Sequence, residues 1–242
     1  KKIFLYLILF LTLFSSHSFG ELSFVQTKDV TSDTPGVRGI NFKPDGKIMY
    51  ITSREGNKKA YIIEYSLSKP FDISTATISF TGGSPKGTAL TCDAEGVDQM
   101  ELPHAIEFKP DGTRMFITSN KNFGVGNTDV AVYQFKLTTP WDSTTLVCEK
   151  IYEVDITDSG TDPVAEDQVR VLSFNPDGTR MFVGGKDFDK IRQYDLTTPF
   201  DLRSGVTPGE ISGSLATSDT SMRNIQFNSD GTALYIAGDT NA

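Results

Sequence analysis

Four cationic or ionisable side chains occupy the same position in a segment that this sequence repeats. Each lies four residues before a phenylalanine, and the four are Arg38, His104, Arg170 and Arg223. Guanidinium groups bind carboxylate, phosphate and sulfate groups through paired, charge-assisted hydrogen bonds. A histidine can add a group that titrates near neutral pH. If the fold gathers these positions, they predict a ring that binds a small anion.

Carboxylates upstream of each position allow a second, structural interpretation. They are Asp33, Asp98 with Glu101, Asp167 and Asp219. An arginine paired with a carboxylate within or between repeats would be copied as faithfully as a ligand-binding residue, and it would bind nothing. The sequence leaves both the ion-pair network and the ligand-binding ring open.

No familiar catalytic or metal-binding motif accompanies these residues. The sequence contains no Gly-x-Ser-x-Gly, no His-Glu-x-x-His and no phosphate-binding glycine loop. One histidine and two cysteines remain after residue 20, too few for a usual Cys/His zinc site. Asp155, Asp158 and Asp162 lack the spacing of a calcium loop, and we interpret them as a solvated turn. The sequence therefore identifies no catalytic residue, metal ligand or cofactor.

The repeat itself determines where the ring residues lie. Its first half occurs four times, as VRGINFKPDGKIMYITS from Val37, PHAIEFKPDGTRMFITS from Pro103, VRVLSFNPDGTRMFVGG from Val169 and MRNIQFNSDGTALYIAG from Met222. The turn glycines of successive copies are separated by 66, 66 and 53 residues. Such self-similarity indicates a repeat architecture.

Each copy reads as a short run of β-strands. Arg38, Ile40 and Phe42 alternate with period two, and Pro-Asp-Gly then closes a hairpin. A second half occurs three times and ends in a Pro-aromatic-Asp turn, whose aromatic residue we interpret as blade packing because every copy has one. A weaker fourth strand follows. Four short antiparallel strands per repeat predict an all-β fold, the β-propeller.

The core Phe-x-Pro-Asp-Gly-x-x-Met/Leu-Phe/Tyr resembles the WD-like Pro-Asp-Gly repeats of Tol-system periplasmic propellers and the YVTN-type repeats of surface propellers. The resemblance covers nearly all of residues 22–242. It implies a propeller but no single activity, because such blades occur in binding scaffolds, lactonases and quinoprotein-like domains. The Leu-x-x-Pro-Phe/Trp-Asp extension departs from both groups.

About three and a half blades are encoded, since the fourth copy stops after its second strand. An unpaired edge of this kind is one that natural sheets avoid. We therefore expect a piece of a longer propeller of six to eight blades. The alternative is a four-bladed ring in which Leu22 to Gln26 serves as an outer strand.

Residues 1–20 have the pattern of a signal peptide, and residues 21–242 form the propeller, with repeats beginning near 37, 103, 169 and 222. Lys1 and Lys2 precede an apolar run that is too short to span a bilayer, and Ser18 and Gly20 precede a cut before Glu21. An uncleaved anchor is the alternative. We expect an exported protein, periplasmic or extracellular, with no membrane insertion after cleavage.

The net charge excludes two classes of binding partner, and the two cysteines allow a disulfide. After residue 20 the chain carries 21 basic and 31 acidic side chains, which argues against nucleic acid and anionic membranes as partners. Cys92 and Cys148 form a disulfide in one interpretation and remain two buried thiols in the other. The pair would join an insert between blades to a later outer strand.

The preferred function from sequence is a non-catalytic scaffold that binds a protein, a peptide, a glycan or a small anionic ligand. The alternative is a lactonase- or quinoprotein-like enzyme that acts on a small anionic substrate in the channel. A purely structural surface-layer or adhesin module is a third possibility. Propeller enzymes assemble their sites from scattered channel residues, so a missing motif does not decide between these classes.

Overall fold

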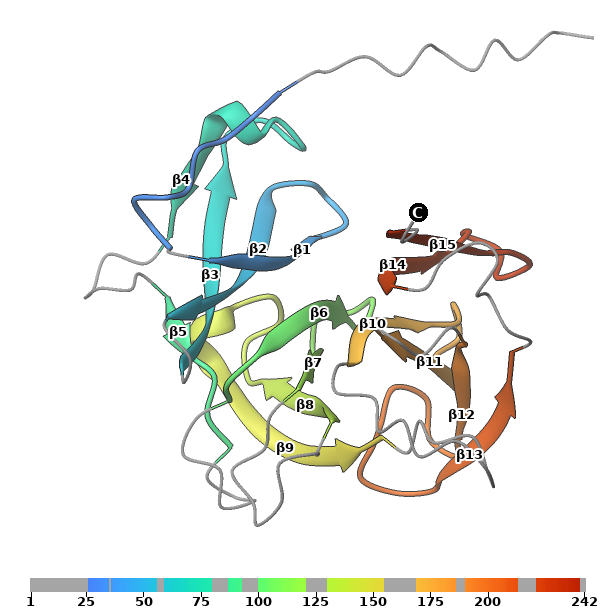
Figure 1. Cartoon of the computed structure of the whole chain (residues 1–242). Coiled ribbons are helices and arrows are strands. Elements are labelled where there is room, and N and C mark those ends of the chain that lie inside the picture. The colour runs from blue at the N-terminus through green and yellow to red at the C-terminus, as the bar shows by residue number, and fades with distance from the viewer. Residues whose placement is uncertain are drawn as a thin grey trace, which may run out of the picture.

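The computed structural model of this chain consists of β-strands in four antiparallel sheets (Figure 1). It describes residues 26–34, 36–55, 59–79, 87–92, 100–120, 130–154, 169–185, 190–212 and 221–239. The predicted leader lies outside these residues, as do Asp98, Asp155, Asp158, Asp162, Asp167 and Asp219. None of the helices within the described ranges has the length and hydrophobicity needed to cross a bilayer.

Each sheet corresponds to one repeat, and we call it a blade. Blade one contains β1 (Val37–Phe42), β2 (Ile48–Glu55), β3 (Lys59–Leu67) and β4 (Ala76–Ile78), with β5 (Thr88–Ala89) also paired to β3. Blade two contains β6 (Pro103–Phe108), β7 (Arg114–Ser119), β8 (Ala131–Leu137) and β9 (Leu146–Glu153). Blade three contains β10 (Val169–Phe174), β11 (Arg180–Gly185), β12 (Arg192–Leu196) and β13 (Val206–Ile211). The described part of blade four contains β14 (Ser221–Phe227) and β15 (Leu234–Asp239).

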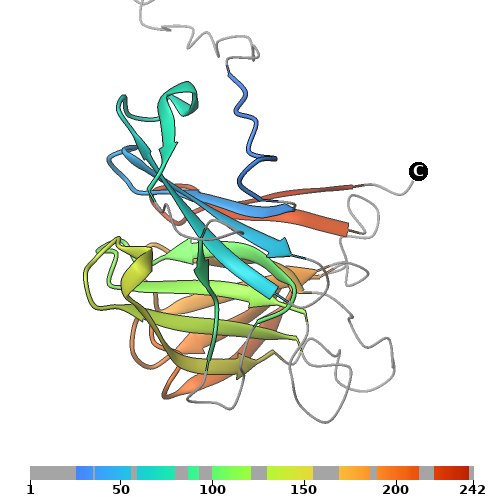
Figure 2. The ribbon, with the colours of Figure 1, turned by 90° about the vertical axis from the view of Figure 1, so that its left-hand side faces the viewer.

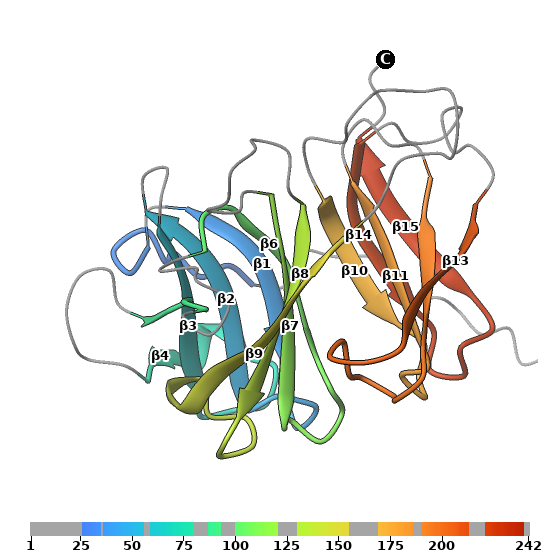
Figure 3. The ribbon, with the colours of Figure 1, turned by 90° about the horizontal axis from the view of Figure 1, so that it is seen from below.

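The first strand of every blade lies innermost. Figure 1 shows β1, β6, β10 and β14 gathered at the centre, while β4, β9 and β13 lie outside. The inner strands are neighbours in chain order, since β1 contacts β6, β6 contacts β10 and β10 contacts β14. Figure 3 shows the same sheets from below, standing side by side. Radially stacked antiparallel sheets of this kind form part of a β-propeller, so the predicted all-β fold of four-stranded antiparallel blades is confirmed.

The two turn motifs of each repeat meet in space. Gly112 has φ of 73° and Trp141 has φ of 67°, and the Trp141 amide donates to the Gly112 carbonyl at 3.1 Å. The indole ring packs on the glycine so closely that a Cβ at that position would collide with it. Phe71 and Phe200 repeat this arrangement on Gly46 and Gly178. The aromatic residue of each Pro-aromatic-Asp turn therefore packs on the Pro-Asp-Gly turn of the same blade, in line with a packing role.

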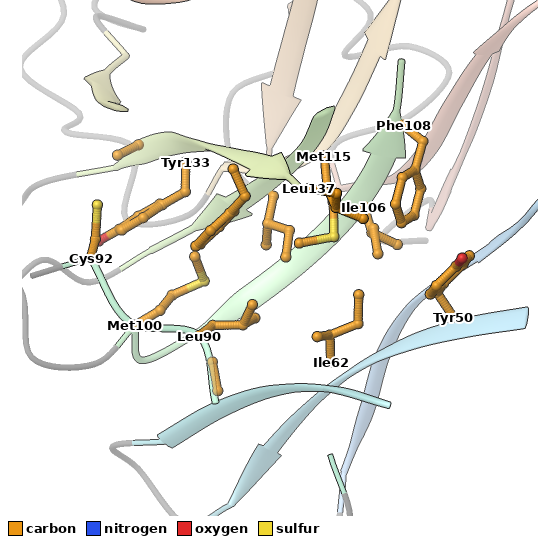
Figure 4. Close-up of a cluster of buried hydrophobic side chains, with 14 residues drawn as sticks. Tyr50, Ile62, Leu90, Cys92, Met100, Ile106, Phe108, Met115, Tyr133 and Leu137 are labelled. Carbon is orange, nitrogen blue, oxygen red and sulfur yellow. The ribbon is translucent and has the colours of Figure 1, made fainter. Parts of the chain in front are cut away.

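Aromatic rings also join neighbouring blades. Phe108 lies between Tyr50 of the preceding blade and Trp141 of its own, with ring centroids 4.6 Å and 5.2 Å away. Figure 4 shows Tyr50 on blade one facing the cluster that Phe108, Ile106 and Met115 form on blade two. Such offset ring pairs add to the stabilisation from apolar burial. Blades two, three and four thus each contact an aromatic side chain of the blade before them.

The segment after blade one is anchored in the same cluster. Leu90, Cys92 and Met100 are fully or almost fully buried there, so this part of the insert is core (Figure 4). In the structure Cys92 forms a disulfide with Cys148 of β9, with Cα atoms 5.1 Å apart. The bond connects the insert to the outer strand of blade two, as the disulfide interpretation requires.

Candidate functional site

A β-bulge positions each ring residue. Ile40 and Phe42 oppose Ile51 and Met49 in regular register, but the register shifts between residues 37 and 39, where Arg38 lies. Arg38 therefore does not share one face with Ile40 and Phe42, contrary to the simple alternation expected from sequence. A bulge re-aims the side chain that it carries. The other inner strands show the same shift, at Pro103/Ile106, Val169/Val171 and Met222/Asn224.

Threonine hydroxyls hold two of these bulges. The Gly39 amide donates to Thr52 Oγ1 at 2.7 Å, and the Ala105 amide donates to Thr118 Oγ1 at 2.9 Å. Thr52 Oγ1 donates in turn to the His104 carbonyl of the next blade at 3.1 Å. Because Thr52 and Thr118 are buried, these bonds fix the start of the inner strands against one another.

The structure brings all four predicted ring residues to one pocket. Its volume is about 460 Å³, and the inner strands of all four blades line it. Arg38 and Arg223 are exposed, whereas His104 and Arg170 are half-buried. Backbone and side chains of Gly39, Asn41, Glu107, Asn224 and Gln226 complete a mostly polar lining.

Three arginines and one histidine contribute side chains to the pocket. Partial desolvation lowers the pKa of Arg38, although the residue is exposed overall, and repulsion from Arg54 and Arg223 lowers it further. Burial lowers the pKa of His104 to about 3, with additional repulsion from the arginines, Arg170 foremost. His104 is therefore neutral near pH 7, which corrects the expectation that it titrates there. The cationic side chains of the pocket are therefore its arginines.

A neighbour in its own blade orients the His104 ring. Asn120 Nδ2 donates to His104 Nε2 at 2.6 Å, a bond that the neutral imidazole can accept. Asn120, just after β7, and Arg54, near the end of β2, occupy the same repeat position in blades two and one. We did not single out this position in the sequence, although the alignment of repeats already placed a polar residue there in each of these two blades.

The acidic residues upstream do not neutralise Arg38. Asp33 instead accepts a hydrogen bond from the Tyr65 hydroxyl at 2.9 Å. Among the described residues no carboxylate forms an ion pair with Arg38. Glu101, which precedes β6 in the chain, is buried. For Arg38, the ion-pair interpretation therefore finds no support in the described part of the chain.

Glu107 is a pocket residue that sequence reasoning missed. It lies one residue before the core phenylalanine, where the other blades carry Asn41, Ser173 and Gln226. Burial raises the pKa of Glu107 to about 8. Within the described ranges it makes no hydrogen bond or ion pair that would offset this cost. Blade two thus departs from the repeat twice, with His104 in place of arginine and Glu107 in place of a neutral side chain.

Known structures resemble this chain in fold. A candidate 6-phosphogluconolactonase from Bacteroides uniformis superposes with a TM-score of 0.51 at 15% identity, over 84% of this chain and 47% of its own. The periplasmic gluconolactonase PpgL of Pseudomonas aeruginosa gives 0.50 at 14% identity, over 84% and 47%. The Dos1 propeller gives 0.45 at 10% identity, over 84% and 38%. No protein-family model and no curated protein matches the sequence.

The arrangement of the sheets defines the class of protein, and the similarities to known structures do not define its activity. The chain is a β-propeller protein with a polar, arginine-lined pocket where its inner strands meet. It spans about half the length of the solved structures that it matches. At identities of 15% and below, the likeness concerns the fold alone.

Proposed function

We propose that this chain is an exported scaffold of Pro-Asp-Gly-type blades that binds a small anionic ligand in the central pocket. The supporting observation is the convergence of Arg38, Arg170 and Arg223 on one cavity of about 460 Å³. The whole protein carries a net charge of −8, so the cationic pocket contrasts with its surroundings. Such a field attracts and orients carboxylate, phosphate or sulfate groups.

Calorimetric titration of the full chain, produced by export, tests this function. The probes are inorganic phosphate, sulfate, gluconate and glucuronate. We expect saturable binding of at least one probe that weakens with salt. Arg38→Gln and Arg223→Gln should each reduce affinity about tenfold, the equivalent of one charge-assisted hydrogen bond.

Arg180→Gln is the matched control, because Arg180 is an exposed arginine of β11 that pairs with Asp195 outside the pocket. Its affinity should equal that of the wild type. Binding that is absent for all four probes, or that the pocket variants leave unchanged, contradicts the proposed function. Equal losses in Arg180→Gln would indicate a nonspecific charge effect.

One observation favours a second candidate, the hydrolysis of a cyclic ester. Glu107 and His104 lie on the same inner strand and line the same pocket. A carboxylic acid with its pKa near 8 can protonate a leaving oxygen at neutral pH, whereas the lowered pKa of His104 makes its imidazole a weak base, so we assign it a hydrogen-bonding role only. The lactonase names of two similar structures suggest a first substrate.

A pH-stat assay with glucono-δ-lactone measures this activity as acid release above the spontaneous rate. We expect Glu107→Gln to lower the enzymatic rate at least about 100-fold, the usual size of a general acid–base contribution. Arg180→Gln should retain the full rate. A wild-type rate equal to the spontaneous one excludes this lactone as substrate and leaves the binding proposal standing.

A further inference from the structure

The central pocket contains side chains of both signs of charge. Among the described residues that line it, Glu107 of β6 is the one carboxyl, beside the guanidinium groups of Arg38, Arg170 and Arg223. Within the described ranges Glu107 forms no ion pair with any of these arginines. Burial alone raises its pKa, and no arginine opposes the rise, as a close guanidinium would. The cavity therefore holds its opposite charges apart.

Spacing along the inner strands accounts for this separation. The three arginines lie near the start of their strands, at the repeat position that His104 occupies in β6. Glu107 follows His104 by three residues on the same strand. Three residues of a strand span at most roughly 10 Å. The pocket thus has a cationic end and, deeper along the strands, a carboxyl end.

Apolar side chains flank the carboxyl end. Glu107 lies directly opposite Phe116 of β7, and such cross-strand partners share one face of the sheet. Phe116 is fully buried and packs on Phe174 of blade three, with ring centroids 4.6 Å apart. The Glu107 carboxyl is therefore desolvated without a hydrogen bond in exchange, which disfavours its ionised form.

Blade construction does not require a carboxyl at this position. Asn41, Ser173 and Gln226 occupy it in the other three blades. Asn41 Nδ2 donates to the Ile106 carbonyl at 3.1 Å and so joins the inner strands of blades one and two. A neutral polar side chain is thus sufficient for the fold, and Glu107 adds an acidic group that packing does not use.

The cavity is large enough for more than an isolated anionic group. In Figure 2 blade one (blue to cyan) and blade four (red) lie above the second and third blades, and all four contribute lining residues. The volume of about 460 Å³ falls within the range of pockets that enclose a small organic molecule. One such molecule can therefore reach both the arginines and Glu107.

We propose that the ligand of this pocket is an ω-amino carboxylate, whose carboxylate binds the arginines and whose ammonium group, several carbons away, pairs with Glu107. The inference rests on the proposed function, since it assigns the second end of the same ligand. A molecule with opposite charges at its two ends matches a cavity that holds opposite charges apart. The ammonium supplies the partner that the Glu107 carboxyl lacks, so the carboxyl ionises on binding and its proton passes to the solvent. A simple anion leaves Glu107 without a partner.

Calorimetric titration of the full chain, produced by export, with three probes of similar length tests this assignment. ε-Aminocaproate carries both charged ends, caproate lacks the amine, and ε-hydroxycaproate carries a hydroxyl in its place. We expect ε-aminocaproate to bind at least about tenfold more tightly than the other two. Glu107→Gln should lower its affinity to that of caproate. Gln226 occupies the same position in blade four, so a glutamine fits the fold there. Glu153→Gln, at an exposed carboxyl that ends β9, is the matched control and should retain the difference.

Proton release gives a second measurement. Glu107 is protonated at pH 7, so ε-aminocaproate should release up to about one proton on binding, whereas caproate should release none. The other titratable groups of the lining are Arg38 of β1, His104 of β6, Arg170 of β10 and Arg223 of β14. The arginines stay protonated and His104 is already neutral, so none of them supplies this proton. Titrations in imidazole and Bis-Tris buffers, whose heats of protonation differ, measure the release.

The outcomes separate this inference from the function on which it rests. If phosphate or gluconate binds but ε-aminocaproate binds no more tightly than caproate or ε-hydroxycaproate, the inference is wrong and the anion-binding function stands. Binding of ε-aminocaproate without proton release, or with unchanged affinity in Glu107→Gln, would also overturn it. Hexylamine, which lacks the carboxylate, should bind more weakly than ε-aminocaproate, and equal binding would contradict a two-ended ligand. If no probe binds, both proposals fail.

Discussion

Arg114 of blade two and Asp201 of blade three form an ion pair across the boundary between their blades, with Nη2 and Oδ2 3.1 Å apart. The same guanidinium donates from Nη1 to the Phe200 carbonyl at 3.1 Å. Asp201 is 5% exposed and also accepts Arg203 Nη2 at 2.7 Å. The aspartate of the Pro-aromatic-Asp turn is therefore a contact between blades as well as a local cap.

Asp201→Asn should destabilise the protein by about 2–4 kcal/mol, because it leaves Arg114 partly buried without its full countercharge. The hydrogen bond from Arg203, above all, holds the pKa of Asp201 well below its usual range. This stabilisation is therefore present above about pH 4 and is lost as the pH falls further. Urea unfolding measures it. Asp195→Asn, in an exposed pair with Arg180, should cost at most about 1 kcal/mol, and equal losses would contradict the prediction.

Glu107→Gln should stabilise the protein, in a pH-dependent manner. The unfolded chain ionises Glu107 above about pH 4.5, whereas burial keeps its proton in the folded state up to about pH 8. Stability therefore falls through this window in the wild type, and the variant should gain at least about 1 kcal/mol at pH 8 but little at pH 4. Thermal melting at both pH values measures the difference. Equal gains at both would contradict it.

The His104 imidazole should remain neutral well below pH 6 in the folded protein. It is the one histidine after residue 20, so its NMR signals can be followed without assignment of others. Arg170→Gln should raise the pKa of His104, since repulsion from Arg170 is the largest charge effect on it. A bound anion should raise this pKa as well. A wild-type pKa near 6.5 would contradict the buried, arginine-flanked placement.

Reduction of the Cys92–Cys148 bond should destabilise the protein. The bond closes a loop with a sequence separation of 56 residues. The chain-entropy model assigns such a loop roughly 4 kcal/mol. The double variant Cys92→Ser, Cys148→Ser should match the reduced wild type in urea. Intact mass should rise by two hydrogen atoms on reduction, and an unchanged mass would show two free thiols.

Export should produce a mature chain that begins at Glu21. Signal cleavage requires small side chains at the −3 and −1 positions, which Ser18 and Gly20 supply. N-terminal sequencing of the exported protein checks the cut. Gly20→Phe should block it and leave the precursor in the membrane fraction. A wild-type chain retained uncleaved would instead support the anchor interpretation.

Much of the fold could be predicted from the sequence because blade construction is local. The Pro-Asp-Gly turns, the period-two strands and the buried Tyr65, Phe135 and Tyr194 of the third strands follow from steric rules within about ten residues. The repeat then extends these rules to whole sheets. The repeat also predicted that Arg38 lies at the same position of its blade as the other ring residues.

The tertiary structure alone decided what surrounds those residues. The bulge that turns Arg38 into the pocket is a register shift between β1 and β2, and the neutral state of His104 and the raised pKa of Glu107 follow from burial in the folded chain. Burial and electrostatic repulsion act across blades, between residues far apart in the chain. Alternation and spacing describe one strand at a time, so they predicted that the arginines share one repeat position. They could not predict how buried these residues are or which charges surround them in the pocket.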